Sequence, residues 1–246
     1  MKRRAILATP VIGVLFACAA CTSSRGVPGA DSAVLPPSQV ADFKTLYEQN
    51  CAGCHGAVGK GNAAVALANP VFLAIADDDV IRRTVTTGVP GTPMPAFGQS
   101  AGGMLTDRQI DALVRGIRSW AKSDNLRNTI FPSYEAHAPG DPQRGADVYR
   151  TYCSSCHGID GRGGNKASSI VDGSYLALVS DQQLRTIVIA GRPELGAPDW
   201  RSDIEDRPMS PQEITDVVAW LSVQRPQFQG HPYTNSSAGR EKEGSR

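Results

Sequence analysis

The chain of 246 residues is poor in aromatic side chains, in net charge and in long apolar runs. Aromatic residues make up 6% of it, against 25 glycines and 17 prolines. A small domain of that composition struggles to build an apolar core, and a large buried prosthetic group would repair the deficit. The formal net charge is only +1, so no strongly basic patch indicates nucleic acid as a partner. The apolar run at residues 5–20 is too short to span a bilayer comfortably.

That run follows three basic residues at positions 2–4, which is the pattern of a secretory signal peptide. It ends in small residues and two cysteines, and so resembles the signal of a bacterial lipoprotein, in which a cysteine becomes the lipidated first residue. Cys18 has Leu at −3 and Ala at −1, whereas Cys21 is followed by a Ser/Thr-rich segment. We expect a signal peptide over residues 1–20 and lipidation of Cys18 or Cys21, with Cys18 preferred; an ordinary signal cleaved without lipidation is the alternative. Residues 21–40 then form a flexible tether.

The other four cysteines form two copies of one motif, Cys-x-x-Cys-His, which begin 102 residues apart. This motif is the attachment signature of a c-type haem, because its two thiols can bond to the porphyrin and its histidine can bind the iron. Zinc ribbons place their Cys-x-x-Cys pairs close together, and a thioredoxin-like pair would not explain the His and Gly that follow each pair. No cysteine is left for a structural disulfide. The predicted attachment residues are Cys51, Cys54 and His55 in the first copy and Cys153, Cys156 and His157 in the second.

The motifs lie in two similar stretches of chain, offset by 102–104 positions. Each stretch is predicted to begin with a helix that contains the motif, over residues 42–55 and 142–157. A Gly-rich loop and a short helix ending at a glycine follow. The last helix begins at Thr106 or Ser210, each with Gln or Glu three residues later, and carries an apolar stripe at i, i+3, i+4 and i+7. This ordered correspondence indicates an internal duplication.

With these motifs, the chain resembles a tandem class I cytochrome c. The resemblance rests on C-x-x-C-H near the first helix, a Gly-x-x-Met-Pro loop and a final amphipathic helix. It implies an all-α fold of two cytochrome c-like helical domains in tandem. Each domain would enclose one covalently bound haem c, with His on one face of the iron and usually Met on the other. The expected organisation is domain 1 over 41–125, a linker over 126–140, domain 2 over 141–225 and a polar tail over 226–246.

The two copies differ in the second axial ligand. Met94, held between two prolines, is the expected ligand of haem 1. Alignment of the second Pro-rich loop places Ala197 at the matching position, and alanine cannot bind iron. Three alternatives remain for haem 2. Met209, which aligns with Leu105, could be recruited by a rearranged loop; the iron could be five-coordinate or water-bound; or a distant residue or a partner could supply the ligand.

Two arginines and two histidines complete the candidate residues. Arg82 and Arg185 occupy the same place in each repeat and are candidates for pairing with haem propionates, since arginine forms bidentate pairs with carboxylates. A solvated helix face is the alternative. His137 and His231 lie in the expected linker and tail and are interpreted as exposed bystanders.

Together these features predict an exported dihaem c-type cytochrome, anchored by lipid on the periplasmic side of a bacterial membrane. Its expected partners are redox proteins of a respiratory chain: a quinol-oxidising complex, a dehydrogenase or a terminal oxidase. One alternative is a haem enzyme of the peroxidase or thiosulfate dehydrogenase type that uses an open haem 2. Another is a permanent haem subunit of a larger oxidoreductase complex. The short halves and the lack of an acid–base histidine near the second loop disfavour the enzyme.

Overall fold

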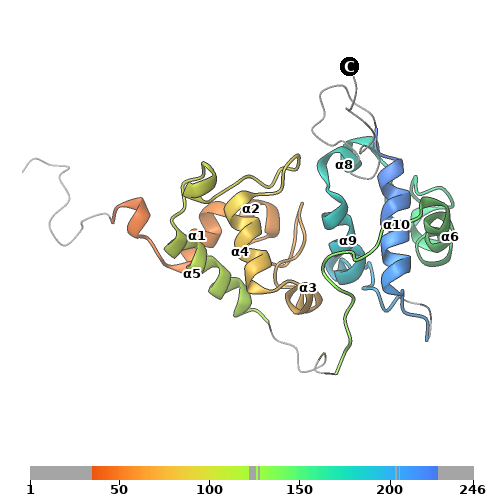
Figure 1. The fold of residues 1–246 in the computed structure, drawn as a ribbon, viewed down its shortest axis with the longest axis horizontal. Coiled ribbons are helices and arrows are strands. Elements are labelled where there is room, and N and C mark those ends of the chain that lie inside the picture. The colour runs from red at the N-terminus through yellow and green to blue at the C-terminus, as the bar shows by residue number, and fades with distance from the viewer. Residues whose placement is uncertain (1–34, 122–125, 127, 203, 205, 227–246) are drawn as a thin grey trace, which may run out of the picture. The chain divides into compact units, whose positions relative to one another are not determined.

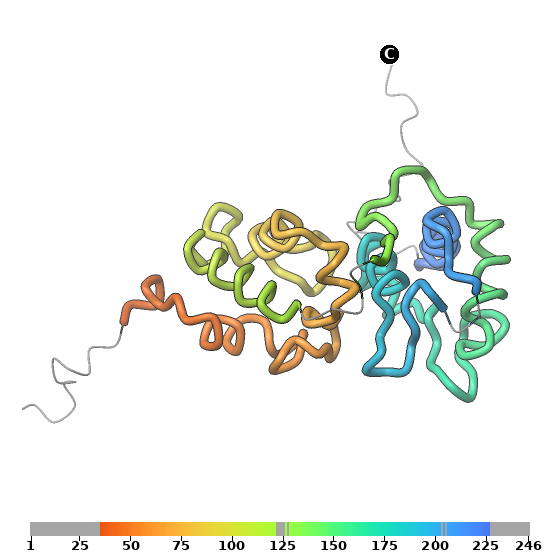
Figure 2. The backbone as a smooth tube through the Cα atoms, turned by 90° about the horizontal axis from the view of Figure 1, so that it is seen from below, coloured from red at the N-terminus to blue at the C-terminus, as the bar shows by residue number. Residues whose placement is uncertain are grey.

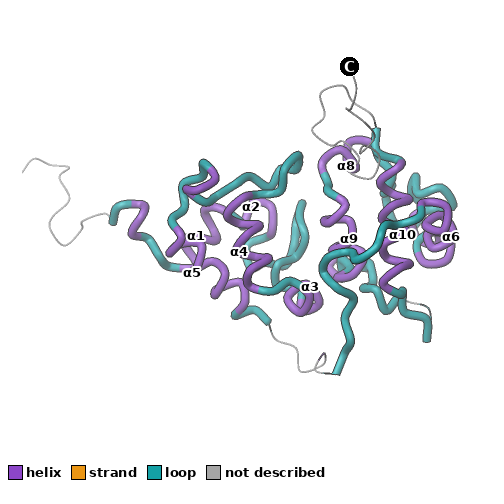
Figure 3. Tube along the Cα trace, viewed as in Figure 1, coloured by secondary structure: helices purple, strands orange, loops and turns teal. Residues whose placement is uncertain are grey.

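The computed structural model describes residues 35–121, 126, 128–202, 204 and 206–226. These residues form helices and loops without a β-strand, which confirms the all-α prediction (Figure 3). The contacts between residues divide the chain into two units, Met1–Pro36 and Pro37–Arg246, and the second unit contains both motifs. The expected signal peptide, both candidate lipidation sites and His231 lie outside the described residues. In the part of the chain that is described, no helix is long and apolar enough to cross a bilayer.

The second half of the described chain repeats the helices of the first, as the duplication predicts (Figure 1). The first half contains η2 (Pro37–Gln39), α1 (Phe43–Asn50), α2 (Ala52–His55), α3 (Pro70–Ile75), α4 (Asp78–Thr87), η3 (Gln99–Ala101) and α5 (Asp107–Arg118). The second contains α6 (Pro142–Tyr152), α7 (Ser154–His157), α8 (Gly173–Leu178), α9 (Asp181–Ala190), η5 (Pro193–Leu195) and α10 (Pro211–Val223). In Figure 2, the segments that follow α7 and α9 project from the same side of the second half.

Local signals in the sequence account for most helix boundaries. Thr106 and Ser210 cap α5 and α10, and both capping boxes form as predicted. Two details were not predicted. Each motif helix is interrupted at the first cysteine, where the φ of Cys51 is −122°. The short helices α3 and α8 were also missed, although Asn69 and Asp172 cap them through their side-chain oxygens.

The first and last helices of each half cross at a glycine. A Cβ atom added to Gly116 of α5 would lie 2.0 Å from the ring of Phe43 on α1, and one added to Gly145 of α6 would lie 2.0 Å from the carbonyl oxygen of Asp216 on α10. Phe43 aligns with Gly145, and Gly116 aligns with Trp220. The large and small residues have therefore changed sides between the copies, which keeps each crossing close-packed.

The same crossing packs the tyrosine that precedes each motif. Tyr47 lies edge-on to Trp120, with ring centroids 4.9 Å apart. Tyr149 stacks on Trp220 at 4.2 Å. Both tyrosines are almost completely buried. A tryptophan from the turn after α5, or from α10, therefore supports the segment that carries each motif.

A buried carboxylate links α10 to the start of α6. The side chain of Asp216 is 3% exposed. It accepts hydrogen bonds from the Asp141 N–H at 2.7 Å, from Arg144 Nε at 2.8 Å and from Gln212 Nε2 at 2.8 Å. Burial by itself would raise the pKa of Asp216, but these bonds outweigh it and hold the pKa below the ordinary value of 3.8.

We expect Asp216→Asn to lower the free energy of unfolding by about 1.5–3 kcal/mol at pH 7, the range for hydrogen bonds to charged groups. Because the pKa is lower in the folded state, the stabilisation is complete above about pH 4 and is lost as the pH falls through the folded pKa. Urea unfolding at several pH values should show that the difference in free energy of unfolding between the parent and Asp216→Asn becomes smaller in acid. Asp147→Asn is the control, since Asp147 pairs with Arg150 on the surface. Equal losses in both variants would contradict this account.

Candidate haem attachment sites

Each Cys-x-x-Cys-His motif forms a single helical turn whose N-cap is the first cysteine. The backbone N–H groups of Cys54 and His55 both donate to the carbonyl of Cys51, at 3.2 and 3.0 Å. The same two bonds form at the second motif, with the same lengths, from Cys156 and His157. All four motif thiols are free rather than paired as disulfides. Burial, with the neighbouring thiol, raises the pKa of both Cys51 and Cys153 to about 11, so these thiols are neutral at pH 7.

The imidazole of each motif is oriented by a backbone carbonyl. His55 Nδ1 lies 2.9 Å from Val65 O, and His157 Nδ1 lies 2.7 Å from Ser168 O. A carbonyl can only accept, so Nδ1 carries the proton and Nε2 keeps the lone pair that binds a metal. Burial also lowers the pKa of His55, which favours the neutral ring. Two thiols and one available imidazole nitrogen per motif are the donor set that a covalent haem c requires.

Further hydrogen bonds fix the chain after each motif. Tyr47 donates its hydroxyl to Gly56 O at 2.9 Å, and Tyr149 donates to Gly158 O in the second half. The N–H of Gly61 donates to His55 O at 2.9 Å, which closes the Gly-rich loop over the motif. Tyr47 and Tyr149 therefore hold the backbone that follows each motif histidine.

The loop after α4 presents Met94, and the loop after α9 presents Ala197 at the same place. We call residues 88–98 the first loop and residues 191–202 the second loop. The N–H of Val89 donates to Met94 O at 3.0 Å, and the N–H of Arg192 donates to Ala197 O at 3.1 Å. Both loops begin at a glycine with positive φ, 66° and 65°, where an added Cβ atom would lie 2.5 Å from a backbone atom of Pro95 or Pro198. Ala197 is therefore the structural counterpart of Met94.

Met209 occupies the core position of Leu105. The N–H of Leu105 donates to Phe97 O at 2.7 Å, and the N–H of Met209 donates to Trp200 O at 2.8 Å. Both side chains are 6% exposed. The second loop thus keeps the backbone arrangement of the first at this point, and the rearrangement that would recruit Met209 as a ligand is not seen.

The two arginines expected at haem propionates have protein partners. Arg82 donates to the carboxylate of Asp111 on α5. Arg185 is 3% exposed and donates to the carbonyls of Ser133 and Tyr134 and to Thr215 Oγ1, at 2.9–3.2 Å. Ser133 and Tyr134 belong to the segment that connects the two halves, here called the connecting segment. This segment crosses α9 and covers the guanidinium of Arg185, a contact that the sequence repeat could not reveal. The side chain of Arg82 is 42% exposed, and a propionate role for Arg82 or Arg185 stays a prediction.

The other described histidine is exposed, as expected. His137 Nε2 lies 2.9 Å from Ser133 Oγ. It belongs to the connecting segment rather than to either motif. The structure therefore assigns it no place among the candidate iron ligands.

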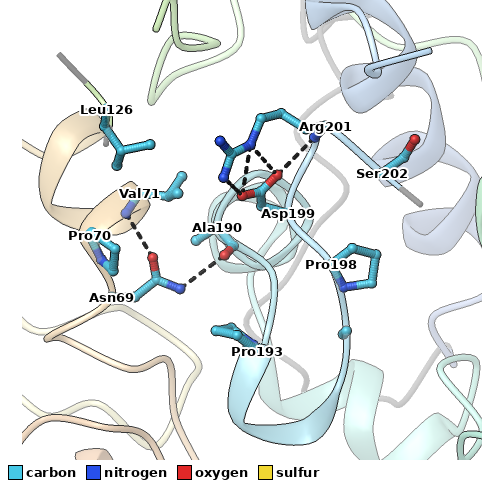
Figure 4. Close-up of a pocket in the computed structure, with 11 residues that line it drawn as sticks. Asn69, Pro70, Val71, Leu126, Ala190, Pro193, Pro198, Asp199, Arg201 and Ser202 are labelled. Carbon is cyan, nitrogen blue, oxygen red and sulfur yellow. Dashed lines mark hydrogen bonds and ion pairs between the residues drawn. The ribbon is translucent and has the colours of Figure 1, made fainter. Parts of the chain in front are cut away.

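The two halves touch beside the second loop, in a contact that the sequence did not reveal (Figure 4). Asn69 caps α3 with its side-chain oxygen and donates from Nδ2 to the last carbonyl of α9, Ala190 O, at 2.9 Å. Arg192 donates to Asn62 O in the Gly-rich loop of the first half, also at 2.9 Å. A pocket of about 570 Å³ lies between Asn69 and the second loop, and Ala197 lines it. The sequence signal for this contact between the halves is that residue 69 carries an amide, Asn69, where the other repeat has a carboxylate, Asp172.

Comparison with known proteins identifies the two halves. Residues 38–115 and 140–221 each match the family described as "Cytochrome C oxidase, cbb3-type, subunit III". A cytochrome bc1 complex cytochrome c subunit of Mycobacterium tuberculosis is 24% identical over 223 residues, which cover 89% of this chain and 74% of that protein. A Cbb3-type cytochrome c oxidase subunit CcoP of Azospirillum sp. is 32% identical over 145 residues, covering 54% and 44%.

A solved structure also shows weak similarity. A chain of a Kuenenia stuttgartiensis reducing HAO-like protein complex is 20% identical with a TM-score of 0.42, covering 78% of this chain and all of that one. This similarity is too low to carry an argument. The family matches, by contrast, span both repeats with their motifs and their first and last helices. The chain belongs to this family and is a tandem class I c-type cytochrome, whose cofactor is covalently bound haem c and whose activity is electron transfer.

Proposed function

We propose that this protein carries electrons through two haems within a bacterial respiratory chain, on the periplasmic side of the membrane and held there by an N-terminal lipid. The observation that carries the proposal is the repetition of one attachment geometry, with two free thiols and an available imidazole nitrogen in each half. Haem c, when bound, supplies a one-electron Fe(III)/Fe(II) couple. The protein positions the group, excludes water from it and tunes its potential.

Each named residue has a distinct role in this proposal. Cys51 and Cys54 bind the first haem covalently, and His55 binds its iron through Nε2. Met94 is the second axial ligand, presented by a loop that prolines at 93 and 95 stiffen. Cys153, Cys156 and His157 hold the second haem in the same way. The proposal therefore assigns seven haem-binding residues in all.

The known complexes of the relatives support respiratory partners. One relative is a subunit of a cytochrome bc1 complex and another is a subunit of a Cbb3-type oxidase. These complexes favour, as a second candidate, a haem subunit that stays bound to a larger complex. Extraction of native membranes in mild detergent distinguishes the two. A mobile carrier runs alone on native gels at moderate salt, whereas a resident subunit runs with its complex.

Haem counting tests the proposal directly. We expect the purified full-length protein to contain two haems per chain by pyridine haemochrome assay. The Cys153→Ala/Cys156→Ala variant should contain one, and the Cys51→Ala/Cys54→Ala variant should also contain one, because thioethers hold each group independently. Haem-stained denaturing gels report covalent attachment. Retention of two haems after loss of one thiol pair would refute the proposed attachment residues.

Variants at the N-terminus provide the matched control. Cys18→Ser and Cys21→Ser should leave the haem count at two. The variant that loses the lipidated residue should move the protein from the membrane fraction to the soluble periplasmic fraction. Membrane retention in both single variants and in the double variant would contradict the lipid anchor without affecting the haem assignment.

A further inference from the structure

The second loop supplies no methionine where the first loop supplies Met94. We infer that the second haem has an open iron face, which binds a small exogenous ligand: a neutral diatomic such as CO in the ferrous state, or a small anion such as cyanide in the ferric state. This inference rests on the proposed function, because it requires a haem attached at Cys153 and Cys156. It adds a ligand-binding site that electron transfer alone does not need.

Ala197 and Met94 occupy equivalent positions in the two loops. Matching backbone hydrogen bonds, from Val89 to Met94 O and from Arg192 to Ala197 O, place the two residues at the same point of their loops. A Cβ atom added to Gly88 or Gly191, at the start of each loop, would lie 2.5 Å from a backbone atom of Pro95 or Pro198 respectively. The alanine is therefore a substitution within a retained loop rather than a shift in alignment. A methyl side chain has no atom that can bind iron.

Met209 is the remaining methionine of the described second half. It is bonded through its N–H to Trp200 O and is as buried as its counterpart Leu105. Recruitment would pull an apolar side chain from a close-packed core and leave a cavity there. The first half keeps a non-ligating leucine at this place, so the position has a packing role in both copies.

The second loop, all of whose residues the structure describes, offers no other side chain to bind the iron. Residues 191–202 contain no methionine, histidine, lysine or cysteine. Their two carboxylates are paired within the loop, Glu194 with Arg192 and Asp199 with Arg201. Trp200 is buried, and its ring lies 5.3 Å from that of Phe131. None of these side chains replaces the missing thioether.

Solvent reaches the substituted position. Ala197 lines the 570 Å³ pocket beside the second loop, so close packing does not seal this stretch of backbone. A longer side chain at 197 therefore has room to be introduced. This makes a gain-of-ligand substitution a practical test.

Ligand binding to the full-length protein with haem loaded provides that test. In dithionite-reduced protein we expect CO to bind one of the two haems, with one CO per chain at saturation by difference spectroscopy. Cyanide should likewise bind one ferric haem and convert a high-spin EPR signal to low spin. Ala197→Met should lower the apparent affinity of the second haem for CO by at least about 100-fold. It should also give a second low-spin haem. Leu195→Met is the control, since Leu195 is 71% exposed in the same loop and its variant should bind CO like the parent.

Two further variants separate the rival ligands. Met209→Leu should leave CO binding and both optical spectra unchanged. If the parent binds no CO but Met209→Leu or His231→Ala does, that residue is the sixth ligand and the inference is overturned. A parent protein with two low-spin haems and no CO binding overturns it in any case. A chain that lacks the second covalent haem would instead show failure of the proposed function, which the pyridine haemochrome count reports independently.

Discussion

Replacement of Met94 by alanine should lower the reduction potential of the first haem by on the order of 0.1–0.3 V, within the roughly 0.8 V range that axial ligands control. A thioether is a soft ligand that favours Fe(II), so its loss stabilises Fe(III) relative to Fe(II). Met94 lies in the proline-flanked first loop, partly shielded from solvent. No neighbouring residue of that loop offers another sulfur atom.

Spectroelectrochemical titration measures this change, and the loss of the far-red thioether-to-Fe(III) charge-transfer band reports the ligand itself. Met104→Ala is the matched control, because Met104 is the other methionine of the first half and is 83% exposed. Its variant should keep both the potential and the band. An unchanged potential in Met94→Ala, or equal changes in both variants, would remove Met94 from the site. Met94→Ala should also bind CO at the first haem, so the number of CO molecules bound per chain should rise from one to two.

Gly145→Ala should destabilise the second half strongly, by about 1–3 kcal/mol or more, as expected for overpacking of a close helix crossing. Its Cβ would lie 2.0 Å from the carbonyl oxygen of Asp216 and 2.8 Å from Trp220 Cβ. Backbone cannot move aside unless all of α10 shifts. That shift would disturb the hydrogen bonds of Asp216 and the stack of Tyr149 on Trp220 as well.

Gly116→Ala is the control for this prediction. It introduces the same methyl group at the corresponding crossing of the first half, where the nearest atoms belong to the side chain of Phe43. The clash includes Phe43 Cγ at 2.1 Å, so this half-buried side chain has to change its χ1 rotamer, but no backbone has to move, and alanine gains about 0.5–1 kcal/mol over glycine in a helix interior. The net loss should therefore be smaller than for Gly145→Ala. Urea unfolding monitored by far-ultraviolet circular dichroism compares the two, and similar losses would mean that the backbone contact at Gly145 is not decisive.

The local parts of the fold were readable from the sequence. The capping boxes at Thr106 and Ser210 and the acidic N-cap of α4 are made within one helical turn, so their signals are local. The short helices α3 and α8 were missed because six residues carry little periodicity, although Asn69 and Asp172 are good N-cap residues. The break at Cys51 was missed because nothing in residue type distinguishes it from helix.

Two Cys-x-x-Cys-His motifs in a duplicated frame suffice to identify the class of the protein, since they specify the attachment chemistry whatever the tertiary fold. Alignment of the two repeats also matches Ala197 with Met94. The burial of Met209 in the core and the cover of Arg185 by the carbonyls of Ser133 and Tyr134 are visible in the folded chain alone. Caps and motifs depend on neighbours along the chain, whereas the partner of a buried side chain depends on which distant segment folds against it.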